Sequence, residues 1–202
     1  MRSLLIPITL FASTTAHAGA APAHPAAASR APIPRAAPRP AALRPIEVGA
    51  LPPSCVALAH VPADARIATP ALAAHVSVAS CAAEQRMNAL GLAHDDASMR
   101  ALAIAVAPSL AMLDDVAAAG GPAWQLTAQF TRGDLYRGMV VRMRAATHGD
   151  ASLEPELKPW LDAARAAFGE VVAIAQAHPD LATTNAVIAS DIAASARALA
   201  PR

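Results

Sequence analysis

The residues best suited to hold a ligand form an arginine-rich segment between positions 132 and 144. Guanidinium groups bind carboxylates and phosphates through paired hydrogen bonds, and Arg137 and Arg144, seven positions apart, would share one face of a helix. We therefore name a candidate contact for an anion or a partner molecule, made by Arg132, Tyr136, Arg137, Arg142 and Arg144. The alternative is a solvated face on which these arginines pair with nearby acids such as Asp134, Asp150 and Glu154.

No catalytic pattern accompanies these arginines. The sequence has no nucleophile elbow, zinc-binding helix motif, phosphate-binding loop or dinucleotide-binding glycine pattern in its folded part. His94 and the acidic pairs at 95–96 and 114–115 have a spacing that matches no metal-ligand pattern. We therefore predict no catalytic residue, no metal site and no cofactor. A hydrolase would have to be sought among His75, His94, Ser98 and Asp115.

The chain has two cysteines, Cys55 and Cys81, which we predict to form a disulfide. An even number of cysteines in an exported chain favours this pairing. On a helix that begins near Thr69, Cys81 would lie on the opposite side from Leu72, so the bridge would hold the segment around Cys55 across the outer face of that helix. Closing a loop of about 26 residues would stabilise the fold by roughly 3 kcal/mol. The alternative is two buried free thiols.

The first 53 residues predict export followed by a linker. Arg2, an apolar stretch over residues 4–12 and an A-x-A pattern at 16–18 are typical of a secretory signal peptide, residues 1–18. Residues 19–53 contain nine of the eighteen prolines, which favours a disordered Pro/Ala/Arg-rich linker. Residues 19–46 carry four arginines and no acid, whereas residues 47–202 carry eleven basic and fifteen acidic residues. The basic linker would serve as a spacer or as a tether to anionic wall polymers or lipid headgroups.

Residues 54–202 predict an all-α domain, an antiparallel bundle of about five helices. The domain is rich in alanine, the strongest helix former, and poor in β-branched and aromatic residues. Apolar residues recur at helical spacing over 70–90, 99–119, 122–144, 155–177 and from 180 or 184 to 199. Pro108 would kink or split the second helix, and Gly133 favours a break in the third. Trp124 and Trp160 are expected among the bulky residues of the core.

These features predict an exported bacterial protein, periplasmic or extracellular. We assign the chain to a bacterium because arginine outnumbers lysine fifteen to one. Such a ratio is expected from the GC-rich codons of a GC-rich bacterial genome. The leading hypothesis is a non-enzymatic helical module that binds an envelope or extracellular macromolecule or serves the cell envelope. The alternative is a carrier of a small molecule or ion with a cavity in the bundle, and the third is an unrecognised hydrolase.

Two classes of partner are not expected. Nucleic acid is disfavoured because the domain has no net positive charge. A transmembrane anchor is disfavoured because no segment after the signal peptide offers about 20 apolar residues free of charge. The sequence leaves the oligomeric state open.

Overall fold

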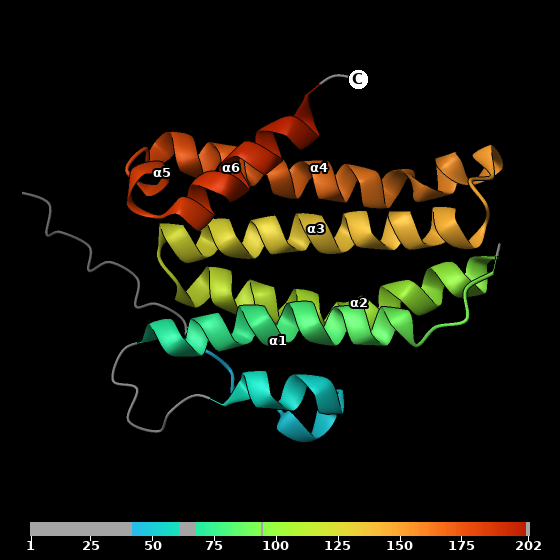
Figure 1. The fold of residues 1–202 in the computed structure, drawn as a ribbon, viewed down its shortest axis with the longest axis horizontal. Coiled ribbons are helices and arrows are strands. Elements are labelled where there is room, and N and C mark those ends of the chain that lie inside the picture. The colour runs from blue at the N-terminus through green and yellow to red at the C-terminus, as the bar shows by residue number, and fades with distance from the viewer. Residues whose placement is uncertain (1–41, 61–67, 94, 201–202) are drawn as a thin grey trace, which may run out of the picture. The chain divides into compact units, whose positions relative to one another are not determined.

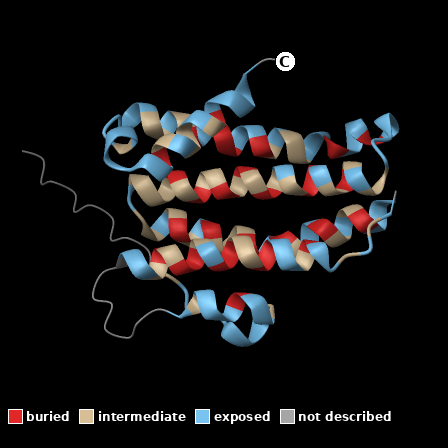
Figure 2. Cartoon of the chain, in the orientation of Figure 1, coloured by how far each residue is buried: buried red, intermediate tan, exposed pale blue. Residues whose placement is uncertain are grey.

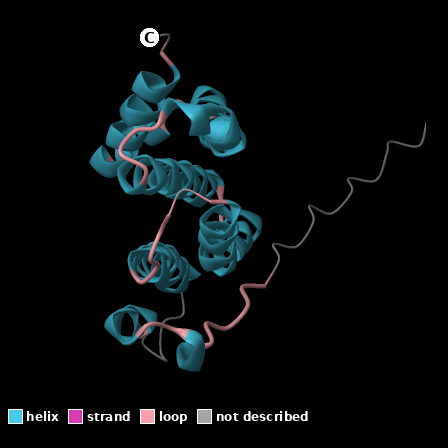
Figure 3. Cartoon of the chain, turned by 90° about the vertical axis from the view of Figure 1, so that its right-hand side faces the viewer, coloured by secondary structure: helices cyan, strands magenta, loops and turns pink. Residues whose placement is uncertain are grey.

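The computed structural model describes residues 42–60, 68–93 and 95–200. Within these ranges the chain is helical and has no strand (Figures 1 and 3). Its elements in chain order are the 3-10 helices η1 (Val48–Ala50) and η2 (Pro53–Ala59), helices α1 (Ala68–Asn88), α2 (Asp96–Ala119) and α3 (Pro122–Ala146), the 3-10 helix η3 (Ala151–Leu153), and helices α4 (Glu154–Ala177), α5 (Leu181–Thr184) and α6 (Ala186–Leu199). The predicted all-α bundle is confirmed. The predicted signal peptide and most of the predicted linker lie outside the described residues.

The four long helices α1 to α4 lie side by side, and each packs against the next along the chain (Figure 1). Their short connections make neighbouring helices antiparallel. Buried residues concentrate on α1 to α4, whereas α5 and most of α6 are exposed (Figure 2). The central core is built mainly from mid-sized aliphatic side chains and methionines, among them Leu102, Val106, Leu113, Met139, Met143 and Leu157. Trp124 and Trp160, expected among the bulky residues of the core, pack against it at its edge and are only partly buried.

Helix α6 docks on the bundle through a second, smaller apolar cluster. Its buried members are Leu126 of α3, Val171 of α4 and Ile188 of α6. Asn185 begins α6 by accepting hydrogen bonds from the backbone N–H groups of Val187 and Ile188. From this anchored end α6 runs obliquely across α4 (Figure 1). Its first half is therefore held by apolar contacts, and its last turn reaches a different part of the α3–α4 surface.

Helices α2 and α3 are each continuous, so α2 is not split at Pro108 and the expected break near Gly133 does not occur. Pro108 lies inside α2 on an exposed face, as does Ile104 four residues earlier. The backbone carbonyl of Ile104 loses its helical partner at Pro108, and on an exposed face water can supply one. Gly133 lies inside α3 and is buried. It contacts α4 rather than ending the helix.

The segment before α1 is fastened to the bundle by a disulfide and by hydrogen bonds. Cys55 in η2 is bonded to Cys81 in α1, which confirms the predicted bridge. Upstream, Arg44 donates from Nε to Asp115 Oδ2 at 2.7 Å, and its backbone oxygen lies 2.8 Å from His75 Nε2. Arg44 lies in the part of the chain that the sequence assigned to the linker, and it makes these polar contacts with α1 and α2.

One described helix, α2, has the length and hydropathy of a membrane span. Asp96 and the pair Asp114–Asp115 place charges near the two ends of this helix. The same helix supplies Leu102, Val106 and other buried residues to the core between α1 and α3.

Candidate functional site

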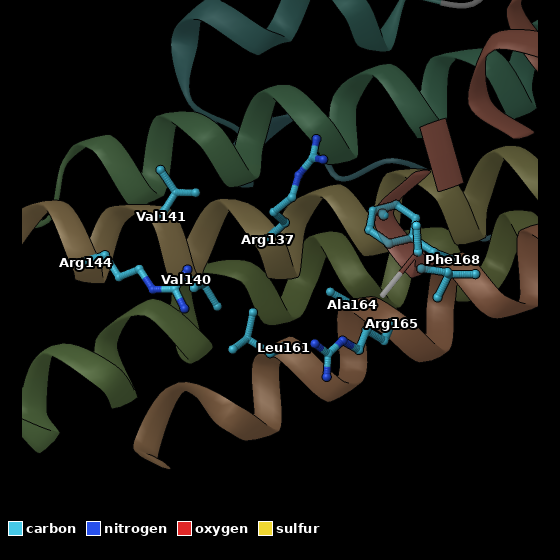
Figure 4. A pocket seen from close by; sticks show the side chains of 11 residues that line it. Arg137, Val140, Val141, Arg144, Leu161, Ala164, Arg165 and Phe168 are labelled. Carbon is cyan, nitrogen blue, oxygen red and sulfur yellow. The ribbon is translucent and has the colours of Figure 1, made fainter. Parts of the chain in front are cut away.

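A groove with a volume of about 640 Å³ lies between α3, α4 and the C-terminal end of α6. Its wall combines apolar side chains with three arginines, and among the described residues that line it there is no Asp or Glu. The lining consists of Arg137, Val140, Val141, Arg144, Leu161, Ala164, Arg165, Phe168, Ala198, Leu199 and Ala200 (Figure 4). Ligand pockets in proteins have volumes of roughly 300 to 1,000 Å³ and similar mixtures of apolar walls with a few polar groups.

The apolar part of the groove depends on a close approach between α3 and α4. A Cβ atom added to Gly133 would lie 2.6 Å from Cε1 of Phe168, so the absence of a side chain at Gly133 lets the aromatic ring rest on the α3 backbone. Two side chains of α3 flank the Phe168 ring. The ring centroid of Phe130 lies 6.0 Å from the ring centroid of Phe168, and the guanidinium carbon of Arg137 lies 5.8 Å from the same point. Gly133 therefore positions the largest apolar residue of the groove.

The buried floor and the exposed rim of the groove are both apolar. Val140, Ala164 and Phe168 are buried. Val141 and Leu199 instead expose 57% and 37% of their surface, and both rank among the large hydrophobic residues left exposed in the described structure. Apolar surface that stays in contact with water inside a concave site is typical of a binding site.

The three arginines of the groove come from two helices. Arg137 and Arg144 lie on α3, on the face that their spacing predicted, and both line the groove. Arg165 lies on α4. Figure 4 shows the side chains of Arg144 and Arg165 pointing toward each other from the two helices, with Val140 and Leu161 between them.

Each of these arginines also has an acidic neighbour outside the groove lining. Arg144 donates from Nε and Nη2 to the two carboxylate oxygens of Glu154, at 2.8 and 2.6 Å. This pairing raises the pKa of Arg144 and lowers the pKa of Glu154. The contact of Arg165 with Asp162 is long, at 3.9 Å. A guanidinium group has five N–H donors, so both arginines keep donors for a further anion.

Arg137 is held in the same way by a residue of its own helix. Its Nη2 donates to Asp134 Oδ1 at 2.8 Å. Burial raises the pKa of Asp134, and the charge of Arg137 opposes this change. On α6, Asp191 has a pKa raised to about 6, first by burial and then by repulsion from Asp134. The junction of α3 and α6 beside the groove thus contains two carboxyl groups and one arginine.

The other members of the predicted arginine segment point elsewhere. Arg132 pairs with Asp114 of α2. Arg142 donates from Nη2 to the side-chain oxygen of Asn88 on α1, at 3.0 Å. Tyr136 packs against the central core. A helix turns its side chains in all directions, so closeness in sequence did not make these residues neighbours.

Of the residues weighed for a hydrolase, His75 and Asp115 line one pocket of about 260 Å³, whereas Ser98 is not among its lining residues. Ser98 lies in the first turn of α2 and Asp115 near its other end, roughly 25 Å along the helix at 1.5 Å per residue. Both nitrogens of the His75 ring lie within hydrogen-bond distance of backbone oxygens, those of Ala71 and Arg44. His94 lies outside the described residues. Among the described residues no group of three His, Cys, Asp or Glu side chains is placed to hold a metal ion.

Sequence reasoning found two of the groove's arginines and missed its other half. Arg165, Phe168 and the last turn of α6 come to this place only through tertiary packing. The signal available in the sequence was Gly133, an unexpected residue inside a helix, which marks a close approach of another element. No family model, curated protein or solved structure matches the chain.

Proposed function

We propose that this chain is an exported helical protein that binds a ligand of the cell envelope or its surroundings in the groove between α3, α4 and α6. The observation that carries the proposal is the groove itself, a concave site with an apolar floor and three arginines. Of the hypotheses drawn from the sequence, this proposal follows that of a small-molecule carrier rather than that of a module that binds only macromolecules. We favour the carrier because the groove is large enough for a small molecule.

Two features support a role outside the cytoplasm. The first is the N-terminal sequence, with its apolar stretch and A-x-A pattern. The second is the disulfide between Cys55 and Cys81, since such bonds persist mainly in oxidising compartments. Neither feature depends on the groove, so the proposed location and the proposed ligand site can be tested separately.

Binding in the groove can be tested with an uncharged apolar dye, N-phenylnaphthylamine, whose fluorescence increases when it leaves water. We expect saturable binding to the folded protein. Val141→Glu should abolish it, because Val141 lies exposed at the groove. Ile104→Glu is the matched control, since Ile104 is 74% exposed on α2 and is not part of the groove. Equal dye binding by both variants would contradict the proposal.

A macromolecular partner remains the second candidate because of the segment before α1. Val48, Val56 and Leu58 are all exposed large hydrophobic residues within eleven positions of one another. Exposed apolar residues this close in sequence would favour an interaction surface if they form one patch. Cross-linking in envelope extract of the wild-type protein and of Leu58→Glu tests this candidate. A partner captured by the wild type and lost in the variant would support it, whereas identical capture by both proteins would count against it.

A further inference from the structure

We infer that the groove binds a single-chain amphiphile with an acidic headgroup. This inference rests on the proposed function and names its ligand class. The acidic group would bind between Arg144 and Arg165, and the hydrocarbon chain would lie along Val140, Leu161 and Phe168. A carboxylate and a phosphate offer the same chemistry to a guanidinium group, namely two oxygens for paired hydrogen bonds.

The headgroup assignment follows from the placement of the cations. Arg144 and Arg165 extend toward each other from opposite helices (Figure 4). Arg144 uses Nε and Nη2 for Glu154, so its Nη1 is not engaged there. Arg165 is 69% exposed at its side chain, and its one ion pair within the described part of the chain is the long one with Asp162. An anion at this point would gain charge-assisted hydrogen bonds without displacing the bond between Arg144 and Glu154.

The chain assignment follows from the surface between and beside these cations. Leu161 and Val140 lie between the two arginines, and Phe168 extends the apolar wall beyond them (Figure 4). Leu199 of α6 adds apolar surface from the last turn. Val140 and Phe168 are already buried, so the apolar area that hydrocarbon would remove from water belongs mainly to the exposed Val141 and Leu199, at about 25 cal/mol for each Å² buried. A small hydrophilic anion would leave the same area exposed.

The basic linker of this chain is a poor alternative occupant. Residues 19–46 contain four arginines and no acid, and the groove already presents three arginines. The like charges of the linker and these arginines would oppose each other. Each of the three arginines has an acidic neighbour, so it is the N–H donors left on Arg144 and Arg165 that favour an anionic ligand.

The experiment measures displacement of bound N-phenylnaphthylamine by four amphiphiles of equal chain length, each below its micelle concentration. Myristate and myristyl phosphate should displace the dye at a concentration at least about tenfold lower than myristyl alcohol, the difference that one charge-assisted hydrogen bond provides. Myristyltrimethylammonium should be the weakest. The two acidic ligands separate a fatty-acid carboxylate from a phosphate as the preferred headgroup, and preference for either supports the inference.

Two variants locate the headgroup. Arg165→Gln should raise the concentration of myristate needed for displacement by roughly tenfold and leave the alcohol unchanged. Arg165 is exposed and makes one long ion pair, so this variant should fold normally. Arg100 is an exposed arginine of α2 outside the groove. Arg100→Gln causes the same change in net charge and should leave dye displacement by myristate and by myristyl alcohol unchanged.

The outcomes separate this inference from the proposed function. If the dye binds and Val141→Glu abolishes its binding, but myristate and myristyl alcohol compete equally, the groove binds ligands and the acidic headgroup is wrong. If the wild type binds no dye and sediments as a dimer that Val141→Glu dissociates, a second copy fills the groove and both proposals fail. Loss of myristate preference in Arg100→Gln as well as Arg165→Gln would also overturn the inference, because net charge rather than the groove would then select the ligand.

Discussion

Gly133→Ala should destabilise the protein, although alanine normally strengthens a helix. The new Cβ would lie 2.6 Å from Cε1 of Phe168 and 2.8 Å from two other ring carbons. Carbon atoms in contact are about 3.5 to 4.0 Å apart, so the ring or the helix must move by about 1 Å. Such overpacking costs about 1 to 3 kcal/mol, and the gain in helix propensity is about 1 kcal/mol. We expect a net loss of up to about 2 kcal/mol.

The control is Gly169→Ala, one residue after Phe168 on α4. A Cβ at Gly169 would have no heavy atom within 4 Å among those considered, so only the gain in helix propensity remains. This variant should be more stable than the wild type by about 0.5 to 1 kcal/mol. Thermal unfolding followed by circular dichroism resolves the two, because 1 kcal/mol shifts the midpoint by roughly 2 to 4 °C for a domain of this size.

The two glycine variants also report on the groove. A displaced Phe168 should weaken dye binding in Gly133→Ala and leave it unchanged in Gly169→Ala. If Gly133→Ala is stabilised as much as Gly169→Ala, the Phe168 ring does not rest on the α3 backbone. In that case the account of how α3 and α4 build the groove would be refuted.

Three further predictions concern stability. Reducing the disulfide between Cys55 and Cys81 should lower the free energy of unfolding by roughly 3 kcal/mol, measured by urea unfolding with and without reductant; equal midpoints would contradict it. Trp160→Ala should cost about 2 kcal/mol, less than the 3 to 5 typical of a fully buried tryptophan, because Trp160 is only partly buried; an unchanged thermal midpoint would show that it contributes no packing energy. Asp191→Asn should stabilise by about 1 kcal/mol at pH 7, reduced by solvent screening, and by nothing near pH 4. The substitution stabilises because burial and Asp134 raise the folded-state pKa of Asp191 to about 6. The wild type therefore loses stability as the pH rises from about 4 to 6. An equal gain in stability at pH 4 and pH 7 would exclude the charge of Asp191 as the cause.

The helical architecture was predictable because it depends on local sequence patterns. Alanine content and apolar spacing indicated the four long helices, and the two cysteines indicated the disulfide. The errors fall where tertiary contacts override local preference. Pro108 lies on an exposed face of α2, where the helix continues through it. Residues 44–53 are rich in neither helix formers nor large apolar residues, yet Arg44 donates a hydrogen bond to Asp115 and its backbone oxygen accepts one from His75.

The candidate site was half predictable for the same reason. The spacing of Arg137 and Arg144 gave a shared face from helical geometry alone. That Arg165 and Phe168 complete the site depends on the register of α4 against α3, and the register depends on Gly133 and Phe168 meeting. No spacing along one helix contains that information.

A crystal structure of the protein with myristate at saturating concentration would show whether the groove between α3, α4 and α6 binds an acidic amphiphile. We predict one hydrocarbon chain along Val140, Leu161 and Phe168, with the carboxylate within hydrogen-bond distance of Arg144 and Arg165. A groove that remains empty, or myristate bound at another place on the protein, would contradict the claim.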